Sequence, residues 1–277
     1  SFFFAFVPTS AKIALDSGVS LMVLLISRCL IGLVILAPLT YSLREPIFVD
    51  RSKVPILIIV SIISVCLIAS TYHAIGYISI ALVLMIIYLF PIGVALITTI
   101  KGEEHLSRTQ WLSIIGVLLG LGILILDKPS ETSFYGVFIS AVGLLLFIAF
   151  IYYTGKLVDE IGSVTINLQL SFFSVILLII YIVFVPVELT LPSNNYGWLG
   201  ILGNGMFYVL SYVLFFIGSK AIGITTASVL ALTEPLFATI VALFILNQYL
   251  SLQEFSGFIV TLCFLSLFLI FGYKRDG

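Results

Sequence analysis

The chain has 277 residues, of which 61% are hydrophobic and only 9% are charged, and its mean hydropathy is +1.29. Soluble domains carry about 25% charged residues, so this chain has too few charged side chains to cover a surface that faces water. The composition therefore excludes a soluble protein and predicts an integral membrane protein of the all-α class. The net charge of −1 excludes nothing further.

Ten apolar segments follow one another along the chain, and each predicts a transmembrane helix. They cover residues 2–15, 20–40, 54–74, 78–100, 107–126, 134–156, 164–186, 196–218, 222–246 and 252–272. The first has only about 14 apolar residues, fewer than the roughly 20 that span a bilayer, so we expect this helix to be truncated, beginning before Ser1. The third and fourth are joined only by residues 76–79, which predicts a tight hairpin.

A displacement of 144 residues, which carries Lys12 onto Lys156, aligns the two halves of the chain without a gap. Other matched positions are Asp16 with Glu160, Gly18 with Gly162, Pro91 with Pro235, and Ser107 with Ser251. The repeat predicts two domains, residues 1–128 and 129–277, with five helices in each. Because five is odd, the second copy would enter the membrane inverted relative to the first, an arrangement found in transporters that work by alternating access.

The Lys and Arg residues of the loops predict the orientation, because cytoplasmic loops are enriched in both. With the N-terminus in the cytoplasm, nine of them lie inside: Arg44, Arg51, Lys53, Lys101, Arg108, Lys156, Lys220, Lys274 and Arg275. Only Lys12 and Lys128 lie outside. The basic loop at 101–108 matches residues 247–251, which have no basic residue, as an outward-facing copy requires. We therefore expect both termini in the cytoplasm and the protein in the inner (plasma) membrane of a bacterium or archaeon.

Only two charged residues lie well inside a predicted helix, Arg28 and Glu234. A charge in the hydrocarbon core costs roughly 2.5–3.5 kcal/mol even on insertion scales. Arg28 could attract an anionic substrate group such as a carboxylate, or it could be a structural residue that bonds helix ends. Glu234 precedes Pro235, which frees a carbonyl group one turn earlier. Carboxyl and carbonyl together could bind an ammonium group or a proton, and the alternative is a structural acid. The first half has Phe90 at the matching position, so the acid is not repeated.

Polar and aromatic side chains supply further substrate-binding candidates. Asn204, Tyr208 and Tyr212 recur every four residues on one face of the eighth predicted helix. Tyr88 lies three residues before the proline of the fourth helix, and His73 lies near the outer end of the third. The alternatives are an ordinary interhelical hydrogen bond for Asn204 and Tyr208, and a membrane-interface residue for His73.

Two repeated residue pairs are candidates for the moving parts. Lys12 and Lys156 lie at the ends of the first and sixth helices. They could close each side of a path in turn, or they could be lysines whose amines extend to the membrane surface. Pro91 and Pro235 would bend the fourth and ninth helices and are candidate hinges.

The sequence has few features of an enzyme. None of its Asp residues lies inside a predicted helix, which excludes an intramembrane aspartyl dyad, and His73 and His105 form no metal-binding motif. Cys29, Cys66 and Cys263 lie in apolar runs without metal-like spacing. We therefore expect no catalytic residues, no metal and no cofactor.

Several short motifs, taken in order, resemble the EamA-type ten-helix transporters of the drug/metabolite transporter (DMT) superfamily. In this chain they are Pro8-Thr9-Ser10-Ala11-Lys12, Ser27-Arg28-Cys29-Leu30, residues 74–81, Pro91, residues 102–107 and residues 227–238. The resemblance covers essentially the whole chain. Two positions depart from the pattern: Gln248 replaces a glutamate often seen there, and the second-half counterpart of Arg28 is Phe172.

The resemblance implies a five-plus-five inverted repeat around a cavity lined by helices one, three, four, six, eight and nine. It also implies secondary transport, often export, of amino acids or other small metabolites. One buried Arg and one buried Glu favour an amino-acid-like solute over a cationic drug or a sugar phosphate. The alternatives are a non-transporting receptor or scaffold and a lipid-carrier translocase. The expected partners are a small-molecule substrate and the lipid bilayer, without nucleic acid, and the protein would act as a monomer or homodimer.

Overall fold

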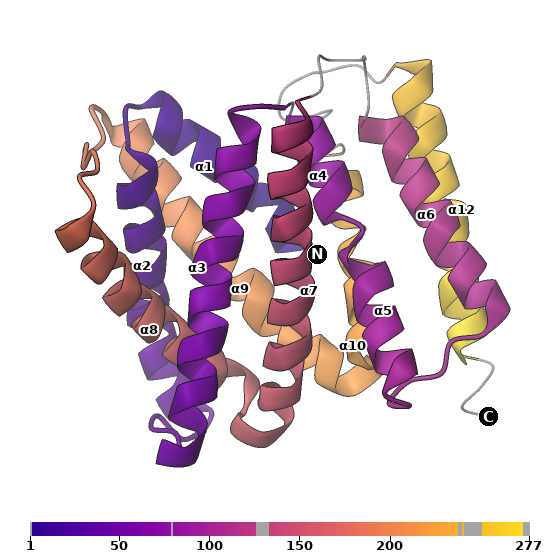
Figure 1. The fold of residues 1–277 in the computed structure, drawn as a ribbon, viewed down its shortest axis with the longest axis horizontal. Helices are drawn as coiled ribbons and strands as arrows, with labels where there is room; N and C mark the ends of the chain where they lie inside the picture. Colours follow the sequence, from indigo (N-terminus) through magenta and orange to yellow (C-terminus); the bar gives the residue numbers. More distant parts are fainter. Residues whose placement is uncertain (1, 79, 126–132, 238–239, 241–250, 274–277) are drawn as a thin grey trace. The chain divides into compact units, whose positions relative to one another are not determined.

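The computed structural model describes residues 2–78, 80–125, 133–237, 240 and 251–273, and these residues form helices and no strand. In chain order the helices are η1 (Phe2–Ala5), α1 (Phe6–Asp16), α2 (Leu21–Ser42), η2 (Arg51–Lys53), α3 (Val54–Ile75), α4 (Ile80–Ile87), α5 (Phe90–Ile100), α6 (Arg108–Ile125), α7 (Phe134–Ile161), α8 (Ser163–Phe184), α9 (Asn195–Ile222), α10 (Ile224–Ala231) and α12 (Leu252–Tyr273) (Figure 1).

Within the described residues, six helical stretches are long and apolar enough to cross a membrane: Leu21–Ser42, Arg51–Ile75, Leu82–Ile100, Phe134–Ile161, Ser163–Phe184 and Asn195–Ile222. Three shorter apolar helices cover Arg108–Leu124, Ile224–Phe237 and Phe255–Phe271. Nine of the ten predicted segments agree with these stretches, and the first, at 2–15, forms η1 and α1 and is not among them. A two-residue turn divides the segment at 78–100 into α4 and α5, and a similar turn follows α10. The predicted boundary at residue 128 and the end of the ninth predicted helix lie outside the described residues.

The chain forms two compact units, and each takes helices from both halves of the sequence. Unit 1 contains residues 1–65 and 153–221, and unit 2 contains residues 66–152 and 222–277. The chain passes from one unit to the other three times: within α3, within α7 and at the end of α9. The packing units are therefore not the two sequence repeats.

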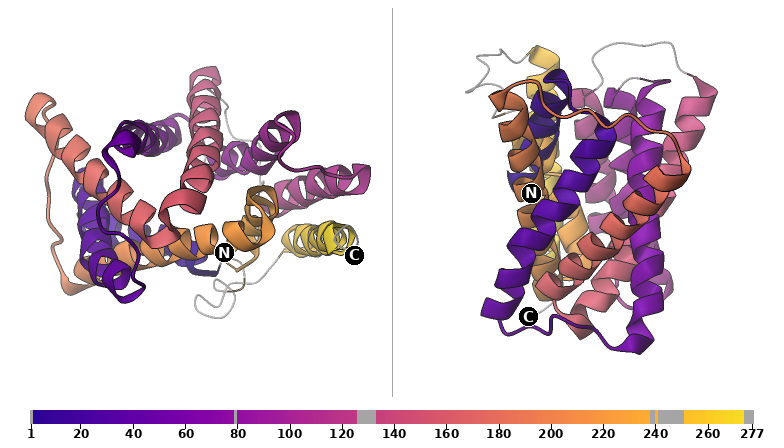
Figure 2. Two further views of the ribbon diagram at one scale, coloured as in Figure 1. Left: turned by 90° about the horizontal axis from the view of Figure 1, so that it is seen from below. Right: turned by 90° about the vertical axis from the view of Figure 1, so that its left-hand side faces the viewer.

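Unit 1 contains a close antiparallel pair formed by α2 and α8 (Figure 2). Gly32 lies where the helices meet, since a Cβ atom there would be 2.8 Å from the Ser171 hydroxyl oxygen. Leu36 on α2 packs with Val164 and Leu168 on α8 in a buried apolar cluster. By the 144-residue displacement, α2 and α8 are the second helices of the two repeats, so here two matching elements pack against each other.

Unit 2 contains a second pair of matching helices, α6 and α12, which are the last helices of the two repeats (Figure 1). Gly120 of α6 lies against Thr261, and Gly257 of α12 lies against Leu124. As α6 advances from Gly120 to Leu124, its contacts on α12 move backwards, so the helices are antiparallel. Small residues at such contacts let helix backbones approach closely.

We expect Gly257→Ala to weaken this contact by about 1–3 kcal/mol, as overpacking does in other helical interiors. A Cβ atom at Gly257 would lie 2.4 Å from the Leu124 backbone nitrogen, which cannot move aside as a flexible side chain can. The matched control is Gly218→Ala in α9, where a Cβ atom meets nothing within 4 Å. Thermal unfolding in detergent should show a lower midpoint for Gly257→Ala only. Equal midpoints for the two variants would contradict the proposed contact.

Candidate functional site

Two helices of unit 2 are interrupted at positions that match in the repeat. The first interruption is at Tyr88 and Leu89, between α4 and α5, and the second is at Leu232 and Thr233, after α10. At both, the backbone makes hydrogen bonds three residues back instead of four, such as Leu89 N to Ile86 O at 3.1 Å and Leu232 N to Val229 O at 3.1 Å. The sequence predicts bends here, and the structure shows a two-residue turn in each helix, with the backbone of Leu89 and Leu232 still in the right-handed helical region.

Proline explains where the interruptions occur. Pro91 and Pro235 each follow an interruption by two residues, and proline has no N–H group to donate. The carbonyl groups of Ile87 and Ala231, four residues before each proline, therefore cannot accept the usual helical hydrogen bond. Main-chain carbonyl groups at such breaks can bind ligands in membrane transporters, where they replace water around a cation.

A buried tyrosine and the acid predicted from the sequence meet at these breaks. The Tyr88 hydroxyl donates a hydrogen bond to the Glu234 carboxyl group. Tyr88 is 7% exposed, and Glu234 is half-buried beside the buried Pro235. The structure thus brings together two candidates from different repeats, and it places each at the interruption of its own helix.

The flanking half-helices explain how the two side chains reach each other. Helix α5, which follows Tyr88, packs against α10, which precedes Glu234. Thr98 in the last turns of α5 and Thr225 at the start of α10 share a hydrogen bond of 3.0 Å between their hydroxyl groups. The two half-helices are therefore antiparallel, and one break lies beside the other.

Unit 1 holds the other predicted charge, Arg28, in α2. Arg28 is 7% exposed, and its guanidinium carbon lies 4.0 Å from the centre of the Tyr208 ring on α9. A desolvated cation–π contact of this kind contributes about 2 kcal/mol. The hydroxyl of Ser64 on α3 donates a hydrogen bond to Tyr208, and the Arg28 side chain hydrogen-bonds the neighbouring Cys29 thiol. This cluster joins three helices around one cation.

The other aromatic candidates of unit 1 extend this cluster along α9. The Tyr212 ring lies 4.7 Å from the Tyr208 ring and 5.0 Å, edge-to-face, from Phe4. Asn204 donates from its side-chain amide to the Val7 carbonyl oxygen at 3.0 Å and so ties α9 to α1. Asn204 therefore forms an interhelical hydrogen bond, which is the alternative to a substrate-binding role at this position.

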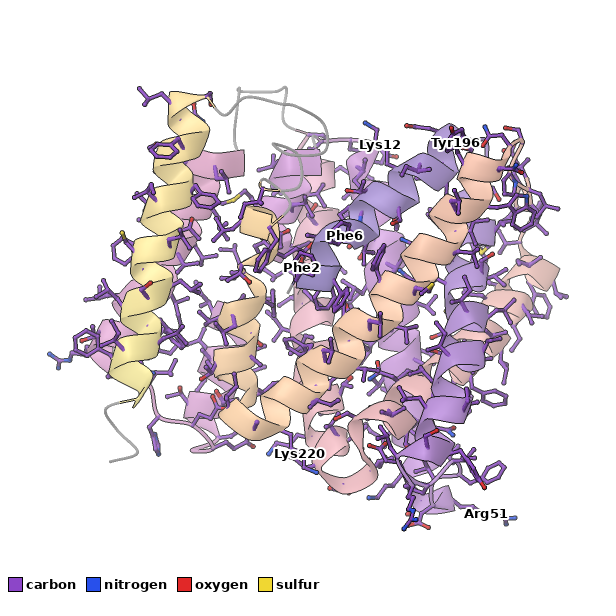
Figure 3. All side chains as sticks on the ribbon, turned by 180° about the vertical axis from the view of Figure 1, so that it is seen from behind. Phe2, Phe6, Lys12, Arg51, Tyr196 and Lys220 are labelled. Carbon is purple, nitrogen blue, oxygen red and sulfur yellow. The ribbon has the colours of Figure 1, made fainter. Side chains whose placement is uncertain are left out.

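The remaining candidates lie in the last two turns of their helices. His73 is exposed and packs edge-to-face with Tyr77 at 5.2 Å and Tyr135 at 6.1 Å, within unit 2. Lys12 and Lys156 are both exposed in unit 1. Figure 3 shows Lys12 and Tyr196 at one end of unit 1 and Arg51 and Lys220 at the other.

Two loop glutamates cap helices in the structure, although the sequence did not indicate this role. The Glu45 carboxylate accepts hydrogen bonds from the Val164 and Thr165 backbone N–H groups at 3.1 and 2.8 Å, at the start of α8. The Glu104 carboxylate accepts in the same way from Ile224 N at 3.0 Å, at the start of α10. A carboxylate at a helix N-terminus is stabilised by the free N–H groups and the helix dipole.

A local signal for both caps was present. Gly162 and Gly223 directly precede the capped helices, with φ of +107° and +84°. This left-handed backbone favours glycine. In addition, a Cβ atom at Gly162 would lie 2.5 Å from the Glu45 carboxylate, and one at Gly223 would lie 2.7 Å from the Glu104 carboxylate.

The described residues form apolar helices, six of them long enough to span a bilayer, and this architecture is that of a polytopic membrane protein. In the part of the chain that the structure describes, no group of three His, Cys, Asp or Glu side chains could hold a metal ion. The chain belongs to the EamA-like transporter family of the DMT superfamily, whose model matches residues 1–126 and 134–272.

Solved structures support the fold. One protein of known crystal structure is similar with a TM-score of 0.79, over 98% of this chain and 97% of its own, at 14% sequence identity. At that identity the similarity shows the fold alone. A comparison with curated proteins finds no match.

Proposed function

We propose that this protein is a secondary transporter that moves a small polar, amino-acid-like metabolite by alternating access, with export as its direction. Membership of the EamA-like family supports transport. The observation that carries the proposal is the Tyr88–Glu234 pair at two adjacent helix breaks in unit 2. A lone carboxyl group next to carbonyl groups released from helical bonding suits an ammonium group or a proton.

The numbers of buried acids and bases favour an amphoteric solute. Arg28 and Glu234 are the two charged residues well inside predicted membrane segments, and they have opposite signs. A cationic drug would be better served by more than one buried acid, and a sugar phosphate by more than one buried base. Within unit 2, Glu234 and Tyr88 are the proposed partners of an ammonium group, and within unit 1, Arg28 and Tyr208 are the proposed partners of a carboxylate. Tyr212, Asn204 and His73 are further proposed contacts.

An inverted ten-helix repeat would supply the two alternating states. The family model matches the chain twice, close to the proposed domains 1–128 and 129–277. The matching helices α2 and α8 are antiparallel, as are α6 and α12, which is the relation that inversion requires. Pro91 and Pro235 are the proposed hinges and Lys12 and Lys156 the proposed gates. Lys12, predicted to lie outside, is at the opposite end of unit 1 from Arg51 and Lys220, which are predicted to lie in the cytoplasm (Figure 3). This arrangement supports the proposal that both termini are cytoplasmic.

Uptake into liposomes that contain the purified protein tests the substrate class. The panel pairs each neutral amino acid with its decarboxylated amine and with its deaminated acid. We expect the intact amino acid to enter faster than either analogue, because it alone presents both charges. Equal uptake rates for an amine and its amino acid would contradict the proposed role of Arg28 in binding the solute carboxylate. No uptake of any solute would favour a receptor, a scaffold or a lipid-carrier translocase.

A further inference from the structure

The short helix α10 connects the loop at 101–107 to the Glu234 site. It has eight residues, Ile224–Ala231. After Ala231 the helix is interrupted at Leu232 and Thr233 and resumes at Glu234. The attachment of the start of α10 therefore contributes to the position of this carboxyl group. The contacts of Glu104 and of the loop at 101–107 described below lie within unit 2.

The start of α10 is held by Glu104. Its Oε1 atom accepts hydrogen bonds from the Ile224 and Thr225 backbone N–H groups, at 3.0 and 3.5 Å. The residue before them, Gly223, has φ of +84° and leaves room for the carboxylate. Because these N–H groups have no partner inside the helix, a carboxylate from another segment is a strong point of attachment.

Thr98 strengthens the same attachment from α5. Its hydroxyl group bonds the Thr225 hydroxyl at 3.0 Å, and both residues are fully buried. Its carbonyl oxygen accepts from the Glu103 N–H at 2.9 Å and the Glu104 N–H at 3.4 Å, which positions the loop. Thr98 thus binds both the capped helix and the loop that caps it.

The loop is in turn attached to α7. The buried Tyr152 donates from its hydroxyl to the Glu103 carboxylate at 2.8 Å, and the Lys101 amine lies 4.7 Å from the centre of the Tyr152 ring. Gly102, with φ of +69°, allows the chain to turn between the two charged residues. One loop therefore ties together α5, α7 and α10.

We propose that Glu104 is a positioning residue that holds α10 against α5 and closes the path to Glu234 from the side of the loop at 101–107. The inference rests on the transport function proposed above. When Glu104 releases the start of α10, the half-helix can move away from α5 and expose the break at Leu232 and Thr233. Glu104 acts through α10 and does not touch the solute.

The chain contains a matched control for this role. Glu45 caps α8 through the same kind of bonds, with Gly162 in the place of Gly223. Helix α8, however, continues unbroken for 22 residues from Ser163 to Phe184 and carries no interruption comparable to that after α10. Loss of the Glu45 cap should cost similar stability without opening a path to Glu234.

The test measures access to the break with a single cysteine. In a variant whose three native cysteines are replaced by alanine, Thr233→Cys is treated with a membrane-impermeant thiol reagent from each side of sealed vesicles. We expect Glu104→Ala to raise the modification rate from the side of the loop by about tenfold, as loss of a helix cap allows. Glu104→Gln, which keeps one acceptor oxygen, should give an intermediate rate, and Glu45→Ala should leave the rate unchanged.

An unchanged rate in Glu104→Ala, or an equal increase in Glu45→Ala, would overturn the proposal. If Glu104→Ala does not fold, the double variant Thr98→Val and Thr225→Val removes the buried hydroxyl pair and serves the same purpose. Because labelling needs no solute, the result is independent of the transport assay. A raised rate in a protein that moves no solute would support the positioning role and refute the proposed function.

Discussion

Glu234→Gln is expected to reduce solute transport in liposomes about 10- to 100-fold and to remove its dependence on pH. The substitution keeps the size and one acceptor oxygen of the side chain but removes the negative charge and the titrating group. A hydrogen bond to a charged group contributes about 1.5–3 kcal/mol, and about 1.4 kcal/mol corresponds to a factor of ten. Loss of ammonium binding therefore accounts for the expected reduction.

Two variants separate this effect from a general loss of carboxyl groups or of stability. Tyr88→Phe keeps Glu234 but removes its hydrogen-bond donor, so we expect weaker transport that still responds to pH. Glu188→Gln removes an exposed loop carboxyl group in unit 1 and should behave as the wild type. A Glu234→Gln protein with the wild-type pH profile would mean that Glu234 carries no coupling proton.

The second large effect is expected at Arg28. Arg28→Met should raise the KM for an amino acid by about 10- to 100-fold, because a charge-assisted bond to the solute carboxylate is worth roughly 1.5–3 kcal/mol. The KM for the matching amine should change little. Arg28→Lys keeps the charge but not the planar group stacked on Tyr208, so we expect an intermediate KM. Uptake kinetics for both solutes provide the measurement.

A structural role for Arg28 makes a different prediction. If the cation only joins α2 to α9, Arg28→Met would lower the thermal unfolding midpoint and impair the two solutes equally. Tyr208→Leu, which removes the ring but keeps Arg28, should lower the midpoint in either case. A change in selectivity between amino acid and amine thus distinguishes binding from packing.

The helices could be predicted from the sequence because bilayer thickness sets their length and charged or turn-forming residues separate them. The segment at 54–74, for example, coincides with α3 (Val54–Ile75). The helix break at Tyr88 could not be predicted in full. A proline predicts a bend, but whether the helix bends or separates depends on what packs against it.

The pairs within the site were also beyond the sequence. Glu234 and Arg28 stood out because charges are rare in apolar segments, but nothing local indicates that Tyr88 bonds Glu234 or that Tyr208 stacks on Arg28. Those contacts depend on the register of antiparallel helices far apart in the chain. The caps formed by Glu45 and Glu104 were hidden for a related reason, since a loop glutamate is ordinarily a solvated surface residue.

The repeat and the packing give two different divisions of the same chain. Sequence similarity pairs residue 12 with residue 156 and separates the halves near residue 128. Packing instead gathers matching helices from both halves into one unit, as α2 with α8 and α6 with α12. Interleaving of this kind cannot be read from a linear repeat, because it depends on which faces of the helices are complementary.

Counterflow tests most directly whether this protein is a secondary transporter that works by alternating access. Liposomes that contain the protein are loaded with an unlabelled amino acid, and the same amino acid in labelled form is added outside. The entry of label is then followed without an inward gradient of the total amino acid. We predict that internal solute accelerates the entry of label, and that Glu234→Gln removes the acceleration. Entry of label at the same rate into loaded and empty liposomes would contradict the account.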